Sequence, residues 1–327
     1  MKSSNKVQTE NLSMSTYLSS LKKIAKIFVR RKCDWSIGIY TGESPFKLSS
    51  QENIKNPVLT AKDVIDVSAE FVADPFMVYE NGTWYMFFEV MNIETNRGEI
   101  GLATSTDGIE WNYQKIILRE SFHLSYPYVF KWDNSYYMVP ESNASNSIRL
   151  YQATDFPEQW SYLNTLIEGQ NFKDSSVVYF QDKWWLFTTT GNNDFLRLYY
   201  AESLTGKWIE HPKSPIIQRD FHIARPGGRM TIFDNKLFRY SQDCQPFRYG
   251  NKVRAFEITE LSTTNYSEKS VNENPIIGAS GYGWNADGMH NIDPHIVNKG
   301  DWIACVDGYH SSFNFGFNSS DFEKIFS

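Results

Sequence analysis

Cysteine is scarce in this chain, which has only Cys33, Cys244 and Cys305 among its 327 residues. Their number is odd and their spacing fits no metal-binding pattern, which argues against a disulfide scaffold and against a structural zinc site. We expect no metal and no other cofactor. Few and scattered cysteines are typical of a reducing compartment, so the sequence predicts a cytoplasmic protein.

Long hydrophobic runs are also missing. No stretch approaches the ~20 apolar residues that a membrane-spanning helix requires, and the N-terminus lacks the apolar core of a signal peptide. Basic residues do not predominate, because 32 Lys and Arg stand against 38 Asp and Glu, a net charge of −6. The chain therefore lacks the positive surface that binds DNA or RNA, and we expect no nucleic acid partner.

Aromatic residues are abundant, at 16% of the chain, and many lie in a recurring pattern. Five segments resemble β-hairpins, each with a short apolar strand, a polar turn and a second strand rich in aromatic residues. They begin near residues 71, 123, 171, 222 and 291. A third strand follows each of the first three hairpins, and a short outer strand such as NYQKIIL closes the unit. Trp84, Trp184, Trp185 and Trp302 recur at one position and are expected to pack between these units.

Four strands repeated about every 50 residues are the signature of a β-propeller blade. The sequence therefore predicts an all-β fold, a five-bladed β-propeller with four-stranded blades, over residues 33–327. The fifth blade has a candidate third strand in FNFGFNSSDF (313–322) but then nearly runs out of chain. We expect WSIGIYTG (35–42) to supply the missing strand, because an edge would otherwise stay unpaired. The longer fourth interval leaves room for an inserted loop within 267–288.

Residues 1–32 are expected to lie outside the propeller, as a polar tail followed by a short amphipathic helix over 15–32. Leu18, Leu21 and Phe28 share one face of this helix, and six basic residues occupy much of the rest. Two interpretations remain open. The helix contacts an anionic membrane at the inner face of the cell membrane, or it packs its apolar stripe on the main domain.

Aligned on Asp74, the five hairpins place a polar residue at one first-strand position of every blade: Asp74, Tyr126, Asp174, Arg225 and Asp293. The first strand of each blade lines the central channel, so we expect these side chains to face one axial pocket. Three acids, a cation and a phenol suit a polar site better than a core. The second strands add Glu89 and Glu141. The alternative is a water-filled channel in which Asp before Pro is only a turn pair.

Two arginines flank the glycines of ARPGGR. Arg225 and Arg229 are expected to bind a phosphate or carboxylate of a charged sugar. An ion pair with Asp174 or Asp293 is equally compatible with the sequence.

Histidines lie beside the pocket positions. His123 and His295 are expected either to bond sugar hydroxyls or to serve as core residues. His290, Asp293 and His295 are an alternative ion site, but their spacing matches no strong metal motif.

Two carboxyls across a pocket can hold different pKa values, one charged as base or nucleophile and the other protonated as acid. Cleavage or formation of a glycosidic bond requires this division. The separation of the two carboxyls, which decides between inversion and retention, is not encoded in the sequence.

Several segments carry a more specific resemblance: GEIGLATSTDGIEW, HLSYPYVF, YYMVPES, DKWWLF and EHPKSPI. Over residues 35–266 the chain resembles the N-terminal region of plant glucosamine inositolphosphorylceramide transferases and their free-standing bacterial relatives. In the plant enzymes this region precedes a glycosyltransferase domain, which we do not expect here. More distantly, ADPF (73–76) resembles the five-bladed glycoside hydrolases of families 43, 32 and 130.

The hydrolase resemblance implies catalytic roles for three acids: Asp74 as base or nucleophile, Glu141 as the acid and Asp174 as the third carboxylate. Tyr126 stands where these hydrolases carry the acid of the second blade, which leaves both hydrolysis and glycosyl transfer open.

These features together predict a carbohydrate-active enzyme that acts on glycosidic bonds. Its partner would be a carbohydrate or sugar nucleotide, and its role the synthesis of a surface glycan or glycolipid. A non-catalytic carbohydrate-binding propeller that partners a glycosyltransferase is the alternative. A third alternative is a propeller that binds other proteins and whose central channel holds only water.

Overall fold

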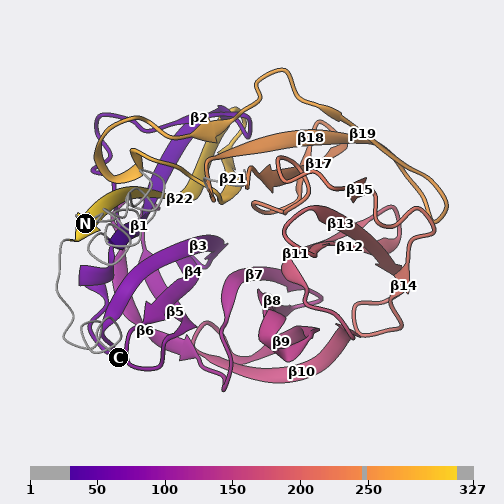
Figure 1. Ribbon diagram of the computed structural model, residues 1–327, viewed down its shortest axis with the longest axis horizontal. Helices are drawn as coiled ribbons and strands as arrows, with labels where there is room; N and C mark the ends of the chain where they lie inside the picture. Colours follow the sequence, from indigo (N-terminus) through magenta and orange to yellow (C-terminus); the bar gives the residue numbers. More distant parts are fainter. Residues whose placement is uncertain (1–29, 245–248, 315–327) are drawn as a thin grey trace, which may run out of the picture. The chain divides into compact units, whose positions relative to one another are not determined.

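β-Strands make up nearly all of the regular structure of the protein. The computed structural model describes residues 30–244 and 249–314, in which Asp34–His310 form one compact unit. Five sheets of antiparallel strands surround a central axis (Figure 1). The predicted five-bladed β-propeller is confirmed.

Each of the first four blades is built from consecutive strands, and its first strand lies nearest the axis. The strands of blades one and two are β3 (Ala69–Glu80), β4 (Thr83–Asn92), β5 (Arg97–Ser105), β6 (Asn112–Leu118), β7 (Ser125–Trp132), β8 (Ser135–Glu141), β9 (Ser147–Asp155) and β10 (Gln159–Glu168). Those of blades three and four are β11 (Lys173–Phe180), β12 (Lys183–Thr190), β13 (Phe195–Ala201), β14 (Ile209–Glu210), β16 (Thr231–Phe233), β17 (Lys236–Gln242), β18 (Lys252–Leu261) and β19 (Tyr266–Ser270).

Short elements decorate this frame. Two-residue strands, β15 (Ile217–Gln218) and β20 (Ile277–Gly278), pair with the third strands β13 and β18. Three 3-10 turns are present: η1 (Ala61–Asp63), η2 (Asn143–Ser145) and η3 (Gly283–Asn285). The insertion predicted within 267–288 contains β20 and η3.

The fifth blade joins the two ends of the described chain. From the axis outward its strands are β21 (Ile292–Asn298), β22 (Asp301–Asn314), β1 (Arg30–Ser44) and β2 (Lys47–Ser49). Ring closure by an N-terminal strand is therefore confirmed. The predicted third strand at 313–322 is wrong, because Phe313 and Asn314 end β22 and β1 takes the third place. Residues 315–322 lie outside the described residues.

The predicted amphipathic helix over 15–32 lies mostly outside the described residues. Its last three residues, Arg30 to Lys32, begin strand β1, so the helix does not extend to Lys32. Among the residues that the structure describes, no helix has the length and apolar character needed to cross a membrane.

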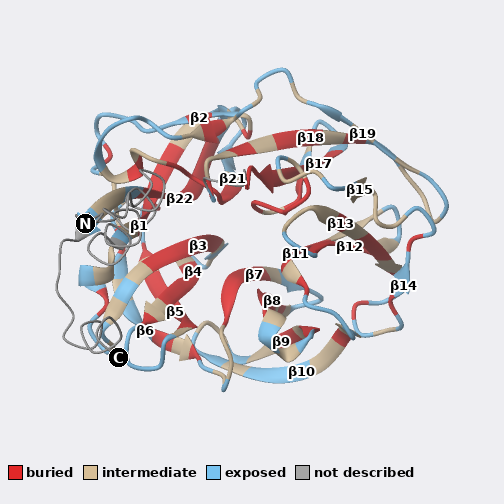
Figure 2. Cartoon of the chain, viewed as in Figure 1, coloured by how far each residue is buried: buried red, intermediate tan, exposed pale blue. Residues whose placement is uncertain are grey.

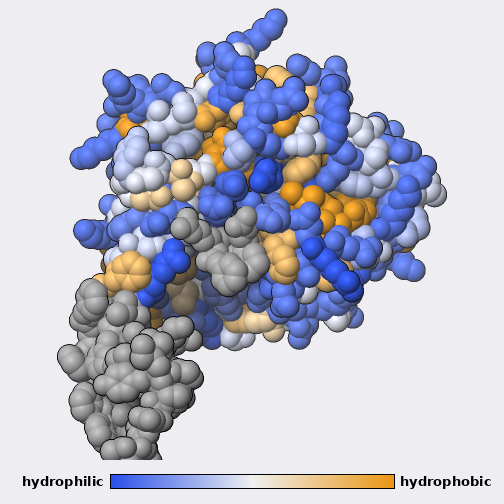
Figure 3. All heavy atoms as spheres, turned by 45° about the horizontal axis from the view of Figure 1, so that its top comes forward, coloured by the Kyte–Doolittle hydropathy of each residue, from blue (hydrophilic) through white to orange (hydrophobic). Residues whose placement is uncertain are grey.

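The core lies between neighbouring blades. Buried residues follow the inner strands, whereas outer strands such as β10 and β19 and many loops are largely exposed (Figure 2). Hydrophilic residues cover most of the face seen in Figure 3, with hydrophobic patches between them. All four tryptophans expected between blades are buried. The rings of Trp184 and Trp132 lie 4.8 Å apart across two blades, and those of Trp302 and Phe233 lie 5.7 Å apart. Each such pair contributes about 0.5–1.5 kcal/mol beyond the contribution of its buried surface. These aromatic contacts between blades hold the propeller together.

Candidate active site

The innermost strands of the first three blades break their register at the predicted pocket positions. β3, β7 and β11 each contain a β-bulge there. The residue inside the bulge has a left-handed backbone, with φ of 51° at Asp74, 46° at Tyr126 and 45° at Asp174. Such φ values are uncommon for residues other than glycine, and bulges redirect a side chain. Three blades therefore use the same local distortion to turn these side chains out of the regular pleat.

A second set of polar residues comes from the second strands. Six residues after the first residue of each second strand, the five blades carry Glu89, Glu141, Thr189, Gln242 and Asp307. All five are buried. The sequence analysis singled out Glu89 and Glu141 but missed Gln242 and Asp307, although counting from each turn would have found them. Buried polar groups need partners, and these find them near the axis.

A pocket of about 210 Å³ lies where these two sets of residues meet. Five residues that the sequence predicted line it: Asp74, Glu89, His123, Glu141 and Arg225. Its wall is completed by Trp35, Phe71, Ala73, Ser125, Tyr249 and His290, of which only His290 had been considered, as an ion ligand. The convergence of distant carboxylates at one end of the axis is thus present in the structure.

Asp174 lies behind Arg225, against the pocket. Nε and Nη2 of Arg225 donate to its two carboxylate oxygens at 2.7 and 3.2 Å, and the amide of Gln242 donates to Oδ2. Burial acts to raise the pKa of Asp174, but the charge and hydrogen bonds of Arg225, together with a hydrogen bond to Glu141 and the charge of His290, outweigh it and lower that pKa. Asp174 is therefore a fixed carboxylate, and the ion pair that the sequence left open is present.

Glu141 shares the same arginine. Its Oε2 accepts from Arg225 Nη2 at 3.3 Å and from the backbone N–H of Asp174 at 3.1 Å, and its Oε1 accepts from the Asn143 amide at 2.8 Å. Burial, and then the charge of Asp174, raise the pKa of Glu141 well above its usual range. The pKa values of the two neighbouring carboxyls are therefore shifted in opposite directions, that of Asp174 downward and that of Glu141 upward.

Glu89 and His123 form a second hydrogen-bonding pair on the pocket wall. The N–H of Gly98 donates to His123 Nδ1 at 2.8 Å, so the neutral ring carries its proton on Nε2, which lies 3.3 Å from Glu89 Oε1. Burial lowers the pKa of His123, and burial followed by the charge of Asp74 raises the pKa of Glu89. A Cβ at position 98 would lie 2.2 Å from the Leu124 carbonyl oxygen, which explains the glycine.

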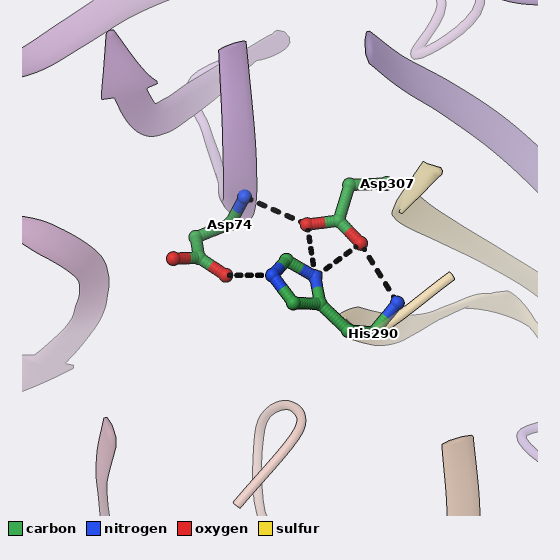
Figure 4. A group of neighbouring side chains, drawn as sticks. All are labelled: Asp74, His290 and Asp307. Carbon is green, nitrogen blue, oxygen red and sulfur yellow. Dashed lines mark hydrogen bonds and ion pairs between the residues drawn. The ribbon is translucent and has the colours of Figure 1, made fainter. Parts of the chain in front are cut away.

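Asp74, His290 and Asp307 form a chain of contacts (Figure 4). Asp307 accepts backbone N–H bonds from Asp74 at 2.9 Å, His290 at 3.1 Å and Asn291 at 2.9 Å, and it lies 2.8 Å from Nδ1 of His290. The other ring nitrogen, Nε2, lies 3.7 Å from Asp74 Oδ1. Trp35 stacks on the imidazole with ring centroids 4.1 Å apart. The histidine is thus held in one orientation between two acids.

Among these three residues, burial and neighbouring charges shift the pKa values of Asp74 and His290 in opposite directions. Burial raises the pKa of Asp74 to about 7, although His290 opposes the rise. Burial acts to lower the pKa of His290, but the charges of Asp307 and then Asp74 outweigh it and raise that pKa.

The same three residues bring possible metal ligands within 4.8 Å of one another. Asp307 fits a metal poorly, because its oxygens already accept three backbone N–H groups and contact the imidazole. Asp74 and Nε2 of His290 remain, whereas a zinc site commonly uses at least three protein ligands and calcium takes six or more oxygens. The arrangement fits a hydrogen-bonded relay better than a metal centre.

Tyr126 is directed across the channel and is not among the residues that line the pocket. Its hydroxyl accepts the N–H of Gly228 at 2.8 Å and lies 3.0 Å from the carbonyl oxygen of Gly228 and 2.9 Å from Ser176 Oγ. Phe76 packs edge-on against it with ring centroids 4.8 Å apart. Burial raises the pKa of Tyr126 well above its usual range, so the phenol stays neutral. It closes the channel beside the pocket.

The alignment of Asp293 with Asp74 is wrong. Asp293 pairs with Cys305, two residues before Asp307, and in the first blade that place belongs to Phe76, opposite Phe87. The fifth blade lacks the bulge of the first, so the hairpin shifts by one side chain. Asp293 consequently does not join the pocket of Asp74.

Asp293 instead forms a separate cluster with Arg229 and His295. Arg229 donates to Asp293 through Nε, and through Nη2 at 3.3 Å, and His295 Nε2 lies 2.9 Å from Asp293 Oδ2. Burial acts to raise the pKa of Asp293, but Arg229 and His295 outweigh it and lower that pKa to about 2. The alternative ion site of His290, Asp293 and His295 is also wrong, because His290 lies with Asp307.

Comparison with known proteins extends this description. Residues 30–309 match the family model described as "Glucosamine inositolphosphorylceramide transferase 1, N-terminal". Over 297 residues the chain is 38% identical to glucosamine inositolphosphorylceramide transferase 1 of Oryza sativa subsp. japonica and 35% identical to that of Arabidopsis thaliana. Each alignment covers 84% of this chain but only 40% and 39% of the two relatives.

The fold is shared with solved structures at low sequence identity. A glycosyl hydrolase from Bacteroides ovatus has a TM-score of 0.57 and 10% identity, with 79% of this chain and 92% of that chain covered. This likeness concerns the fold. The family match spans nearly the whole described propeller, and the chain belongs to the family of glucosamine inositolphosphorylceramide transferase 1 N-terminal regions.

Proposed function

We propose that the pocket binds a sugar and acts on a glycosidic bond, by transfer or by hydrolysis. The observation that carries this proposal is the convergence of Asp74, Glu89 and Glu141 on one small pocket beside the Arg225–Asp174 ion pair, where burial raises the pKa of Glu141 and raises that of Asp74 to about 7. Glycosidic chemistry needs an acid and a base or nucleophile at the same pH. One small pocket supplies both.

Each carboxyl then has a distinct role. Glu141 donates its proton to the oxygen of the bond that breaks, and Asp74 acts as base or nucleophile. His290 orients Asp74 and favours its charged form, since Nε2 lies 3.7 Å from Asp74 Oδ1. Asp174 stays paired with Arg225 and, through its charge, keeps Glu141 protonated.

The rest of the wall supports a carbohydrate ligand. Trp35, Phe71 and Tyr249 offer aromatic surface to the apolar face of a sugar ring, and Glu89 with His123 offers partners to its hydroxyls. The relatives named as transferases and the hydrolase of like fold support the same class of ligand. A sugar nucleotide as donor, and a role in making a surface glycan or glycolipid, are part of this proposal.

Substitution of the two leading acids tests the proposal. A screen of aryl glycosides and sugar nucleotides identifies a turnover assay for the full chain. Asp74→Asn and Glu141→Gln are each expected to lower kcat by at least about 100-fold, the typical contribution of general acid or base catalysis. Stabilisation against heat by the bound sugar should survive in both, because binding shifts the melting temperature through ligand concentration over Kd.

Glu52→Gln is the matched control, because Glu52 is an exposed acid between β2 and β3 and does not line the pocket. It should leave kcat unchanged. Full turnover by Asp74→Asn and by Glu141→Gln would refute the assigned roles.

A carbohydrate-binding module without catalysis is the second candidate. It is favoured by the complete engagement of Asp174 with Arg225 and Gln242, and by the hydroxyl of Tyr126, which is bonded across the channel. This candidate predicts sugar density in soaked crystals, no turnover anywhere in the screen, and unchanged sugar affinity in Asp74→Asn.

Residues 15–32 carry a separate proposal, peripheral contact of a cytoplasmic protein with an anionic membrane surface. Each basic residue near such a surface adds about 1 kcal/mol. The full chain is expected to sediment with vesicles that contain phosphatidylserine but not with neutral phosphatidylcholine vesicles. A chain that lacks residues 1–29, and so keeps β1 intact, should sediment with neither. Equal sedimentation of the full and the shortened chain would mean that residues 1–29 do not carry the membrane contact.

A further inference from the structure

A second cavity, of about 710 Å³, lies near the hairpin turns at which the innermost strands end. Its lining comes from blades one, two and five, and Arg229 reaches it from blade four. On strand β3 the fully buried Phe76 stands between Asp74, which lines the first pocket, and Met77, which lines this cavity, and its ring packs against Tyr126. Its volume is in the range of cavities that hold ligands, and the proposed sugar chemistry makes no use of it.

Arg229 supplies hydrogen-bond donors to this cavity. Its Nε and Nη2 are bonded to Asp293, and Nη2 also to the Met77 carbonyl at 3.2 Å. Its Nη1 has no hydrogen-bond partner within residues 30–244 and 249–314. Only 15% of the side chain is exposed, so these donors are directed by a rigid ion pair rather than by a mobile chain.

The other charges at the cavity point to the same kind of ligand. Lys131 lines it as a second cation and is paired with Glu80 at 2.9 Å. The one carboxylate that lines it belongs to Asp107, whose Oδ1 accepts the N–H groups of Ile109 at 2.8 Å and Glu110 at 2.9 Å. These bonds engage only Oδ1 of Asp107. The free N–H groups on Nη1 of Arg229 fit an acceptor-rich group, above all a carboxylate.

The end of the channel at this cavity is surrounded by apolar side chains. The last residues of four innermost strands leave 36% to 59% of their surface exposed, and we call them the apolar ring: Tyr79, Trp132, Ile232, Ile296 and Val297. Innermost strands run in the same direction in every blade, so these ends share one face of the propeller. Large apolar side chains gathered on one face mark an interaction surface.

We propose that this face binds a polypeptide segment that inserts an aspartate or glutamate side chain toward Arg229 and lays apolar side chains on the apolar ring. Three of the five residues of the apolar ring, Ile232, Ile296 and Val297, are branched aliphatic residues, which suit apolar side chains, whereas the aromatic Tyr79 and Trp132 suit either a side chain or a sugar. The alignments cover 40% of the rice relative, so in that protein the module is joined to a longer stretch of other polypeptide. A surface for polypeptide contact is in keeping with that arrangement.

An array of blocked nonapeptides tests this proposal on the full chain. Each peptide carries a central Glu flanked by Leu, Ile, Phe or Tyr, and each has a counterpart with Gln in its place. Fluorescence anisotropy of the best binder should give a Kd at least about tenfold lower than that of its Gln counterpart, because a bond between two charged groups is worth 1.4 kcal/mol or more.

Variants of exposed residues locate the binding without disturbing the fold. The double variant Ile296→Ser with Val297→Ser is expected to weaken the Glu peptide at least tenfold at an unchanged melting temperature. Ile65→Ser, at a residue that is 81% exposed and outside the apolar ring, is the matched control and should bind as wild type. Asp74→Asn should also bind normally, which keeps this result independent of the proposed sugar chemistry.

Three outcomes overturn the proposal: absence of any binding peptide, equal affinity of Glu and Gln peptides, or full affinity in the double variant. A crystal soak that places an oligosaccharide in this cavity would also overturn it, in favour of a glycan site.

Discussion

Asp74 combines three features that seldom occur together in a carboxylic acid. It is buried, it has a left-handed backbone, and its pKa is raised to about 7. A left-handed Asp costs free energy, of order 1–3 kcal/mol at a position fixed by its surroundings. Such a residue is held in place by its neighbours, here the Asp307 carboxylate on its backbone N–H and His290 beside its carboxyl.

The raised pKa of Asp74 has a consequence for stability. An aspartate in the unfolded chain titrates near 4, so between pH 4 and pH 7 the folded state binds a proton that the unfolded state has released. Stability contributed by this proton therefore falls as pH rises through that window. Asp74→Asn keeps the shape of the side chain and removes the titration.

We expect the urea-derived free energy of unfolding to decline more steeply from pH 5 to pH 8 in the wild type than in Asp74→Asn. Glu89 and Glu141 also have raised pKa values, and the charge of Asp74 contributes to both, so Asp74→Asn reduces their share of the decline as well, in the same direction. Glu52→Gln should follow the wild type. Parallel curves for wild type and Asp74→Asn would show that Asp74 is ionised throughout.

At the scale of elements, strand β1 determines whether the ring is closed. Ile37 and Ile39 of this strand are fully buried, and β1 lies between β22 and β2. The strand is thus a structural part of the fifth blade and not an N-terminal extension.

Truncation of one β1 side chain should show this in stability. Ile37→Ala is expected to lower the free energy of unfolding by about 2–5 kcal/mol, the usual cost of removing a buried aliphatic side chain. Ile65→Ala, at an 81% exposed position, should change it by no more than about 0.5 kcal/mol. Urea denaturation measures both. A cost for Ile37→Ala as small as that of the control would mean that the ring is stable without β1.

The elements also show how far the sequence could be interpreted. Hairpins were predictable because alternation and turn residues are local signals, and β1 was predictable because an open edge needs a partner. Asp293 was misplaced because register is not local. One bulge in β3, absent from β21, moves every side chain beyond it by one position.

On the scale of the whole molecule, the five-fold repeat could be predicted and the partition of its channel could not. Alignment on one position put Asp74 and Asp293 in the same pocket, whereas only Asp74 lines it and Asp293 pairs with Arg229, which lines the second cavity. A sequence does not indicate which aromatic side chain crosses a channel, because that depends on packing among several blades. The acids of the pocket were foreseen, but the placement of His290 and Asp307 beside Asp74 required the structure.

The pairing of β1 with β22 also sets an order of events during protein synthesis. β1 leaves the ribosome early, and its partner is made only near the end of the described chain. The fifth blade cannot assemble until translation has passed β22, and β1 waits meanwhile with unpaired backbone groups that invite mispairing. Closure is therefore a late step in folding, and until then the edge of β1 that faces β22 stays open to mispairing.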